Sequence, residues 1–350
     1  MRALLWFKND LRLDDHPALQ ASLQAQCLLP VYVLDPALVQ RGEFGTRGLG
    51  VHRARFLLES LTALDSELRR RGSRLLVLPG TADQVIPALV EQLQLQQVFT
   101  LQEIAPHERA LVARVARRLG STPLHQSADN SLLRLDELPC PVAQLPQVFT
   151  QFRNLVEERL QVFQPDPAPA SLPPLPATAE TLLQPLPSLS QLGLGEPLSV
   201  AASAFPFAGG EPAALARLRD YLWNSQAVRQ YKETRNGLIG SEYSSKFSPW
   251  LANGCLSARR VVAELRRHEM VLKAGDMERC LPQLAWHLEE PRVGQSYPNY
   301  YAAQLASRFV KESKATGAAR YDVAGAITST LGLVALVYAF TKAAPQGFQD

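Results

Sequence analysis

A short stretch in the second half of the chain crowds hydroxyl groups around a lysine. Residues 243–260 read YSSKFSPWLANGCLSARR, with four serines close to Lys246. Ser248 followed by Pro249 predicts a helix start, because a serine oxygen accepts a hydrogen bond from an orphan amide and proline suits the first helical position. Hydroxyls, helix-start amides and a lysine could together bind an anionic oxygen. The alternative is that these serines only cap helices, since serine is common there.

The elements around this stretch are predicted to be helices. The helix that starts at Ser248 should end at Gly254, because glycine tolerates the left-handed conformation found after helix ends. Ser257 should cap a second helix from residue 258 to about 269, with one apolar face. Upstream, a long helix is expected to start at Glu211. Its apolar positions are Leu215, Leu218, Tyr221, Leu222 and Val228.

The composition excludes several classes of protein. The chain has 350 residues, enough for two or three domains, and its apolar fraction of 46% argues against disorder. A net charge of +3 gives no global basic field for nucleic acid, although a local basic patch is compatible with it. The 4 cysteines form no CxxC pair and the 6 histidines no zinc-binding spacing, which predicts a reducing compartment and no metal site. The charged start does not read as a signal peptide, so the cytoplasm is the expected location.

The first part of the chain alternates between strand and helix patterns. Such alternation predicts an α/β fold, with a parallel sheet covered by helices on both faces. No GxGxxG motif follows the first strand, so the usual dinucleotide fingerprint is absent. A ligand of this domain would lie at the carboxyl ends of the strands. The predicted strands are 3–7, 27–34, 74–78, 97–101 and 122–125, and the predicted helices are 17–24, 52–71, 82–95 and 106–119.

Two further segments differ from this pattern. Residues 165–212 are rich in proline and poor in charge, which predicts a long linker that wraps one domain and leads into the next. Residues 323–341 are uncharged and contain several small residues. Their length is compatible with a membrane span, for which about 17–25 residues suffice. A buried core helix of a soluble domain is the equally weighted alternative.

Several long motifs, in order along residues 1–269, resemble the photolyase/cryptochrome family. They are LLWFKNDLRLDDHPAL, RARFLLESLTALDSELRRRGSRLLVLPG, VFTQFRNLVE and YKETRNGLIGSEYSSKFSPWLANGCLSARRV, and they are most similar to the cryptochrome DASH branch. The resemblance implies a Rossmann-like α/β antenna domain, a long linker and the start of an all-α FAD-binding domain. The corresponding ranges are 1–128 for the antenna domain, 129–211 for the linker, 212–269 for the start of the helical domain and 270–350 for an unassigned tail.

The same resemblance implies roles for individual residues. DNA contacts are implied for Lys232 and Arg235, and a contact with an antenna methenyltetrahydrofolate is implied for Glu103. From the residues alone, Arg235 could also be a solvated surface arginine and Glu103 an exposed charge. No catalytic residue and no metal ligand is assigned. The residues implied to contact FAD, through its phosphates and ribitol, are Tyr231, Ser244, Ser245, Lys246, Phe247 and Ser248.

Three functional hypotheses follow from the resemblance. The first is a DNA photolyase that uses blue light and reduced FAD to repair cyclobutane pyrimidine dimers, preferably in single-stranded DNA. The second is a non-catalytic blue-light photoreceptor or nucleic-acid-binding regulator. The third is a truncated or chimeric chain without activity, because the chain departs from the family pattern after residue 269 and residues 308–347 resemble a transmembrane segment of a major facilitator transporter. A monomer without a protein partner is expected, with membrane association only if 323–341 inserts.

Overall fold

The computed structural model describes most of the chain up to residue 271. The described residues are 1–41, 45, 47–103, 105–128, 132, 138–141, 144–146, 148–157, 164–197, 205–237 and 240–271. They all lie in the unit Met1–Pro298. The predicted apolar segment 323–341 lies outside the described residues, as does the predicted tail from residue 272 onward. Among the described residues, no helix is long and apolar enough to cross a membrane.

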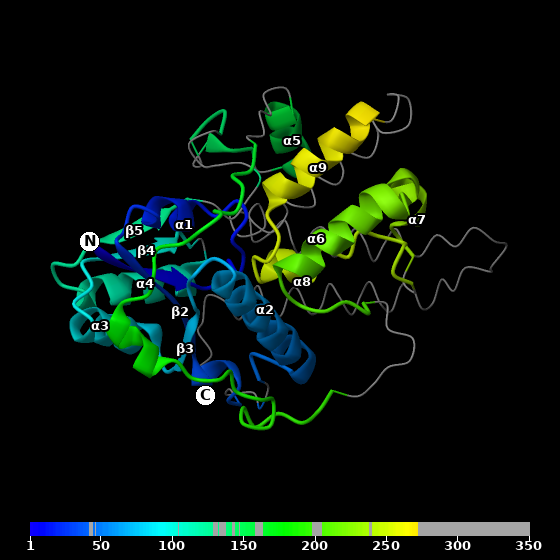
Figure 1. Ribbon diagram of the computed structural model, residues 1–350. Coiled ribbons are helices and arrows are strands. Elements are labelled where there is room, and N and C mark those ends of the chain that lie inside the picture. Colours follow the sequence, from blue (N-terminus) through cyan, green and yellow to red (C-terminus); the bar gives the residue numbers. More distant parts are fainter. Residues whose placement is uncertain are drawn as a thin grey trace, which may run out of the picture. The chain divides into compact units, whose positions relative to one another are not determined.

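A five-stranded parallel sheet forms the centre of the N-terminal part, which confirms the predicted α/β fold (Figure 1). Its strand order is β3-β2-β1-β4-β5, so the chain builds outward from β1 and then returns to the other side of it. Each neighbouring pair is parallel. The connection direction therefore reverses between β1 and β4, where ligands of such sheets bind. The strands are β1 (Arg2–Phe7), β2 (Cys27–Leu34), β3 (Leu76–Pro79), β4 (Gln97–Leu101) and β5 (Leu124–Ser127).

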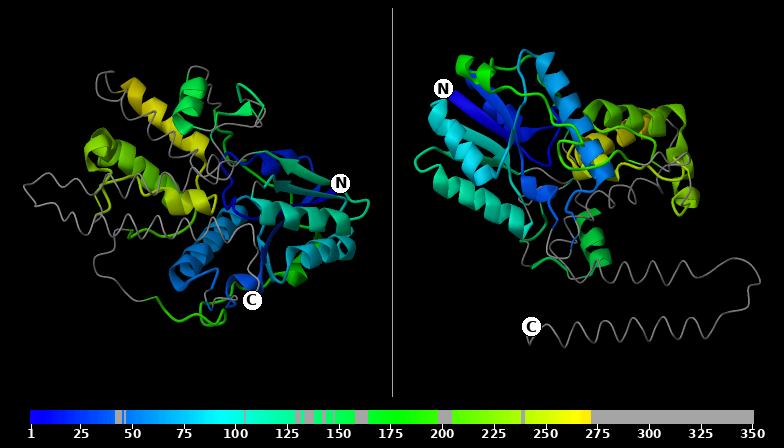
Figure 2. Two further views of the ribbon diagram at one scale, coloured as in Figure 1. Left: turned by 180° about the vertical axis from the view of Figure 1, so that it is seen from behind. Right: turned by 90° about the horizontal axis from the view of Figure 1, so that it is seen from below.

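Helices cover both faces of the sheet (Figures 1 and 2). Along β1, Leu5 and Phe7 belong to one hydrophobic cluster with residues of α1 and α2, whereas Leu4 and Trp6 belong to another with residues of α3 and α4. Successive side chains of a strand point to opposite faces, so each face of β1 buries its own apolar row. Burial on both faces explains why the strands are almost continuously apolar. These helices are α1 (Pro17–Ser22), α2 (Val51–Arg69), α3 (Ala82–Gln92) and α4 (Pro106–Arg118), and α5 (Phe149–Glu157) follows later.

The predicted boundaries in this part agree with the structure within three residues. The largest departures among the strands are two residues: β3 is predicted to start at Arg74 and starts at Leu76, and β5 is predicted at 122–125 and observed at Leu124–Ser127. The carboxylate of Asp65 on α2 accepts the backbone N–H of Leu75 at 2.9 Å. This side-chain contact takes up the Leu75 amide, so regular strand pairing begins one residue later.

The proline-rich segment wraps the α/β part, as predicted. The backbone N–H of Leu172 donates to the carbonyl of Arg71 at 2.9 Å, just beyond the end of α2. The N–H of Leu28 donates to the carbonyl of Pro174 at 3.0 Å. The 3-10 helix η4 (Ala177–Leu182) then packs against the cluster that contains α3 and α4. The segment is therefore held by backbone hydrogen bonds even though it has little regular structure.

The prediction of one long helix from Glu211 is wrong, because the chain forms several short helical pieces there. The break lies at Gln226, whose φ of 50° is left-handed and cannot continue a right-handed helix. A π-helical turn comes immediately before this break. The pieces are α6 (Glu211–Arg219), η5 (Asp220–Asn224), η6 (Ala227–Gln230) and α7 (Tyr231–Thr234). The apolar positions Leu218, Tyr221, Leu222 and Val228 are buried all the same.

Two helices follow the serine-rich stretch, α8 (Ser248–Ala252) and α9 (Ala258–Val271). Gly254, between them, has a φ of 65°, which confirms the predicted left-handed position. Val261, Val262 and Leu265 on α9 are buried, which confirms its predicted apolar face. The predicted domain boundaries at residues 128, 211 and 269 stay predictions.

An aromatic cluster joins α8 to α2. The indole of Trp250 is fully buried and lies 6.0 Å from the ring of Phe56, 5.2 Å from that of Phe205 and 5.5 Å from that of Phe207, measured between centroids. Its Nε1–H donates to the carbonyl of Ala208 at 3.1 Å. Aromatic pairs at such separations add to the free energy of apolar burial. The cluster therefore fixes the helix that directly follows the candidate anion-binding segment.

Candidate functional site

Residues 244–248 carry most of the predicted anion contacts and run directly into α8. Ser248 is the first residue of this helix, and Phe247 occupies the N-cap position without a side-chain hydrogen bond. The prediction that Ser248 caps the helix is therefore wrong. A capping serine needs extended backbone, whereas Phe247 already has helical angles (φ −74°, ψ −17°) that bring Ser248 into the helix.

The polar side chains of this segment are uncommitted. Ser244, Ser245 and Lys246 are partly exposed and Ser248 is exposed. Within the described part of the chain, none of these four side chains has a hydrogen-bond or ion-pair partner. Each hydroxyl can donate one hydrogen bond and the ammonium can donate three. The segment therefore offers a group of free donors with one positive charge, which suits phosphate oxygens.

The two aromatic residues assigned to the same site lie in the hydrophobic core. Phe247 is 1% exposed and Tyr231 is 6% exposed. The ring of Phe247 contacts that of Tyr221 edge-on, with 5.8 Å between centroids. Tyr231 belongs to the same core cluster. Phe247 therefore anchors the segment in the core, and the donors that solvent reaches are the serines and the lysine.

The loop after α8 is held against the turn that follows β1. The backbone N–H of Leu11 donates to the carbonyl of Asn253 at 3.1 Å, and Nη1 of Arg12 donates to the carbonyl of Gly254 at 3.2 Å. A Cβ atom on Gly254 would lie 2.0 Å from the carbonyl oxygen of Asn9. Two backbone segments of the chain approach so closely here that only glycine fits.

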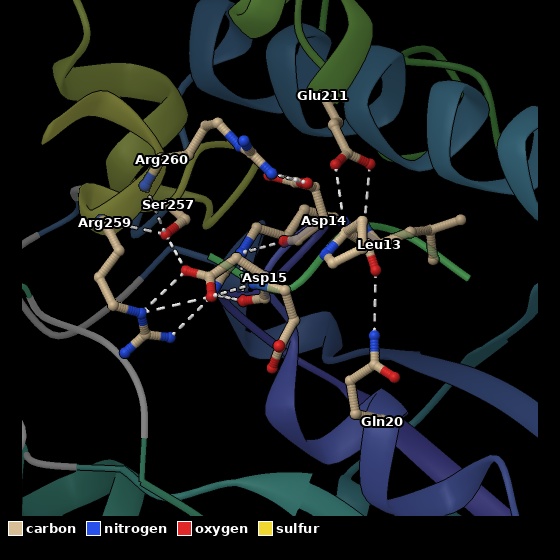
Figure 3. A network of polar contacts seen from close by, with 11 residues as sticks. Leu13, Asp14, Asp15, Gln20, Glu211, Ser257, Arg259 and Arg260 are labelled. Carbon is tan, nitrogen blue, oxygen red and sulfur yellow. Dashed lines mark hydrogen bonds and ion pairs between the residues drawn. The ribbon is translucent and has the colours of Figure 1, made fainter. Parts of the chain in front are cut away.

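A buried ionic network extends this contact to α9 (Figure 3). Ser257 caps α9 as predicted, since its Oγ accepts the backbone N–H groups of Arg259 at 3.1 Å and Arg260 at 3.3 Å. The same hydroxyl donates to the carboxylate of Asp15, which also accepts from the Arg259 guanidinium at 3.1 Å. Asp14 pairs with Arg260 at 2.6 Å. We call these contacts between Asp14, Asp15, Ser257, Arg259 and Arg260 the carboxylate clasp.

Glu211 adds a third carboxylate to the same turn. From the start of α6, it accepts the backbone N–H groups of Leu13 and Asp14 at 2.9 Å each (Figure 3). Burial raises the pKa of Glu211, and the two N–H donors oppose that rise. The helices α6 and α9 are thus both fastened to the turn after β1, and the candidate segment lies between them in sequence.

No sequence pattern identifies the clasp, because its side-chain partners lie 242 to 246 residues apart along the chain. Its only trace in the sequence is a pair of adjacent carboxylates, Asp14 and Asp15, and a pair of adjacent arginines, Arg259 and Arg260, each pair beside a helix start.

A second polar group lies at the carboxyl ends of β1 and β4. The Lys8 ammonium is 3.3 Å from the Glu103 carboxylate and donates to Oγ1 of Thr100 at 2.5 Å. Nearby, Asn9 donates to Glu108 at 3.2 Å. Glu103 is only 6% exposed, so the alternative that it is an exposed surface charge is wrong. Burial raises the pKa of Glu103 to about 7, with Lys8 opposing the rise and Glu108 adding to it.

The raised pKa of Glu103 predicts a pH dependence of stability. Protonated Glu103 is favoured in the folded state, so its stabilising contribution is complete below about pH 4.5 and is lost as pH rises through about 7. We expect Glu103→Gln to reduce the decline in melting temperature between pH 5 and pH 8. Thermal unfolding across this range measures it, with Glu196→Gln at an exposed position as the control. An unchanged decline in Glu103→Gln would contradict the assignment.

The residues assigned to DNA lie on and just after α7. Lys232 and Arg235 are both exposed. The backbone N–H of Arg235 donates to the carbonyl of Tyr231 at 3.0 Å and closes the last turn of this helix. The two candidates for DNA contact therefore lie exposed on α7 and directly after it, whereas Tyr231, a candidate for flavin contact from the same helix, lies in the core.

Comparison with known proteins agrees with this architecture. Residues 3–174 match the DNA photolyase family. The cryptochrome DASH of Gloeobacter violaceus is 39% identical over 269 residues, 76% of this chain and 53% of that protein. The cryptochrome DASH of Synechocystis sp. is 35% identical over 302 residues, 85% of this chain and 61% of that protein. This chain belongs to the photolyase/cryptochrome family. It spans about half the length of the curated relatives that it matches.

Solved structures of family members show the same fold. The crystal structure of Synechocystis sp. cryptochrome has a TM-score of 0.78 and 32% identity, and the match covers 85% of this chain and 62% of that one. A bacterial class III photolyase from Agrobacterium tumefaciens has a TM-score of 0.70 at 23% identity, and the match covers 85% of this chain and 59% of that one. At this lower identity the likeness concerns the fold alone.

Proposed function

We propose that this photolyase/cryptochrome chain is a flavoprotein of the DASH type that repairs cyclobutane pyrimidine dimers under blue light, preferably in single-stranded DNA. The observation that carries the proposal is the group of three hydroxyls and one ammonium at residues 244–248, which have no partner in the described structure. FAD would supply the light absorption and the electron-transfer chemistry when bound. The chain's own residues would bind and orient it and hold the DNA nearby.

Within this proposal, Lys246 and the three serines would hold the pyrophosphate of FAD. Charge-assisted hydrogen bonds of this kind are worth about 1.5–3 kcal/mol each. Tyr231 and Phe247 complete the proposed FAD contacts. Because their rings are buried, we expect them to contribute ring edges and backbone atoms rather than whole ring faces.

Removing the ammonium should weaken flavin binding. We expect Lys246→Ala to raise the dissociation constant for FAD by about tenfold to a hundredfold, because one charge-assisted contact is lost. Titration of the purified protein with FAD, followed by flavin fluorescence and absorption, measures the effect. Lys232→Ala, at an exposed lysine of α7, is the matched control and should bind FAD as the unaltered protein does. Equal affinities for all three proteins would rule out a phosphate role for Lys246.

We further propose that Glu103 contacts an antenna methenyltetrahydrofolate. The buried carboxyl lies at the reversal point between β1 and β4, where ligands of parallel sheets bind. A pKa of Glu103 near 7 allows it to donate as well as accept a hydrogen bond at neutral pH. Such a carboxyl suits a pterin-like ring, which carries both donors and acceptors. Folate absorption that co-purifies with the unaltered protein but not with Glu103→Ala would support this assignment.

The proposed DNA contacts predict a salt dependence. If Arg235 contacts a phosphate, Arg235→Ala should reduce the slope of log affinity against log salt by about one unit. Fluorescence anisotropy with a single-stranded oligonucleotide that carries a thymine dimer measures this slope. Arg117→Ala, at an exposed arginine of α4, is the control. A slope that is the same for Arg235→Ala and the unaltered protein would identify Arg235 as a solvated surface charge. Lys232 is proposed to act in the same way.

We also propose a cytoplasmic location and a monomeric state without a protein partner. The described cysteines, Cys27, Cys140 and Cys255, are free thiols, which suits a reducing compartment. Size-exclusion chromatography with light scattering would test the monomer.

A further inference from the structure

Arg217 of α6 is a buried cation beside the serine-rich segment. Its side chain is 1% exposed. The guanidinium carbon lies 5.0 Å from the ring centroid of Phe207 and 5.1 Å from that of Tyr221. A planar guanidinium stacks well on aromatic faces, and these contacts restrict its orientation. Arg217 is therefore a fixed element of the core rather than a mobile surface charge.

The guanidinium collects backbone carbonyls from the segment that leads into the candidate site. Its Nη2 donates to the carbonyl of Ser241 at 2.8 Å and to that of Ser244 at 3.4 Å. Its Nε donates to the carbonyl of Ser245 at 3.3 Å. Three acceptors within five residues thus converge on one side chain. Hydrogen bonds to Arg217 thus hold the backbone from Ser241 to Ser245.

The remaining guanidinium nitrogen is also occupied. Nη1 donates to Asp220 at 2.9 Å and to Glu242 at 3.1 Å. These carboxylates are 41% and 50% exposed, and they compensate the charge of Arg217. Every nitrogen of the guanidinium therefore already makes hydrogen bonds within the protein. Among the described residues, by contrast, nothing pairs with the ammonium of Lys246.

An anion site must present donors and keep acceptors away, because carbonyl oxygens repel phosphate oxygens. Arg217 binds the carbonyl oxygens of Ser244 and Ser245, while the hydroxyls of these two serines have no hydrogen-bond partner in the part of the chain that the structure describes. We infer that Arg217 is a positioning residue, which holds the backbone of residues 241–245 so that the donors of residues 244–248 are presented to an anionic ligand. Arg217 itself does not touch that ligand. The identity of the ligand rests on the proposed function, whereas the positioning of the segment does not.

Lysine cannot replace arginine in this role. A lysine ammonium is a point donor without a planar fork, so it cannot serve three carbonyls and two carboxylates while lying between two rings. Arg217→Lys keeps the positive charge and removes the planar guanidinium that binds the three carbonyls. Arg219→Lys, on the same helix at an exposed position, is the matched control.

Hydrogen exchange of the ligand-free full chain tests the positioning directly. We expect the amides of residues 241–248 to exchange at least tenfold faster in Arg217→Lys than in the unaltered protein or in Arg219→Lys. The amides of the sheet strands should exchange as slowly as in the unaltered protein, which verifies that the variant is folded. Glu242→Gln, which alters one half-exposed partner of Arg217, should change exchange in the same direction by a smaller factor. Unchanged exchange at residues 241–248 in Arg217→Lys would overturn the inference.

Flavin titration at several salt concentrations separates positioning from direct contact. Arg217→Lys should weaken FAD binding about tenfold or more without changing its salt dependence, whereas Lys246→Ala should reduce that dependence. A reduced salt dependence in Arg217→Lys would make Arg217 a direct ligand, and an unchanged affinity would remove its role in binding. Either result overturns the inference. If the unaltered chain binds no FAD, the proposed function fails, and the exchange experiment still decides whether Arg217 shapes the segment.

Discussion

Replacing Asp15 by alanine is expected to lower the free energy of unfolding by about 3–5 kcal/mol. The Asp15 carboxylate is 2% exposed and accepts hydrogen bonds from Ser257 and from the guanidinium of Arg259, which is itself 7% exposed. Removing the carboxylate takes a buried counter-charge away from the Arg259 guanidinium, which costs far more than losing an exposed ion pair. Asp15 also has a left-handed φ of 52°, a conformation that alanine tolerates less well than aspartate.

Urea unfolding followed by tryptophan fluorescence measures this loss. Asp15→Asn keeps the tolerance for a left-handed backbone and removes only the charge. The decrease in its free energy of unfolding therefore measures the contribution of the ion pair alone. Asp14→Ala is the matched control within the clasp, because the Asp14 and Arg260 side chains are 14% and 22% exposed and solvent screens their attraction. A loss at Asp15 no larger than that at Asp14 would show that the buried pair contributes little.

Replacing Gly254 by alanine should destabilise the protein by a similar amount, about 3–5 kcal/mol, for a steric reason. The added Cβ would lie 2.0 Å from the Asn9 carbonyl oxygen and 2.4 Å from the Asp10 Cα, and both are backbone atoms that cannot rotate away. The φ of 65° at Gly254 adds the cost of placing an L-residue in the left-handed region. The main chains of the two segments would have to separate.

Gly120 offers a control that divides these two costs. It has a comparable φ of 59°, but a Cβ there would meet no atom within 4 Å. Gly120→Ala should therefore cost only the conformational part, about 1–2 kcal/mol. Thermal and urea unfolding of both variants give the comparison. Equal decreases in the free energy of unfolding for the two variants would mean that the backbone around Gly254 can move apart without cost.

Both substitutions act on the same contact between the turn after β1 and the helices α8 and α9. Because α8 begins at Ser248 and the other candidate donors directly precede it, loosening this contact should also disturb the proposed FAD contacts. We expect Asp15→Asn to weaken FAD binding under conditions in which the protein is still folded. The structural and functional roles of this part of the molecule are thus coupled through α8.

The sequence by itself determined those features that depend on neighbours along the chain. Alternating strand and helix patterns predicted the parallel sheet, and short apolar strands buried on both faces confirm it. Gly254 and Ser257 were correctly placed at a helix end and a helix start, because both roles arise from local backbone geometry. The motif around Lys246 predicted a group of donors for the same reason: their types and spacing are visible in one short segment.

Only the tertiary structure decided which side chains are buried, paired or uncommitted. Arg217 and Glu103 read as ordinary charges in the sequence, yet one is enclosed by two rings and three carbonyls and the other lies at a buried strand end. The clasp and the break at Gln226 were likewise invisible. Ion pairing and the pKa of a buried carboxyl depend on desolvation and on charges within a few ångströms. Those neighbours come from distant parts of the chain, so they are set by the folded arrangement and by no local pattern.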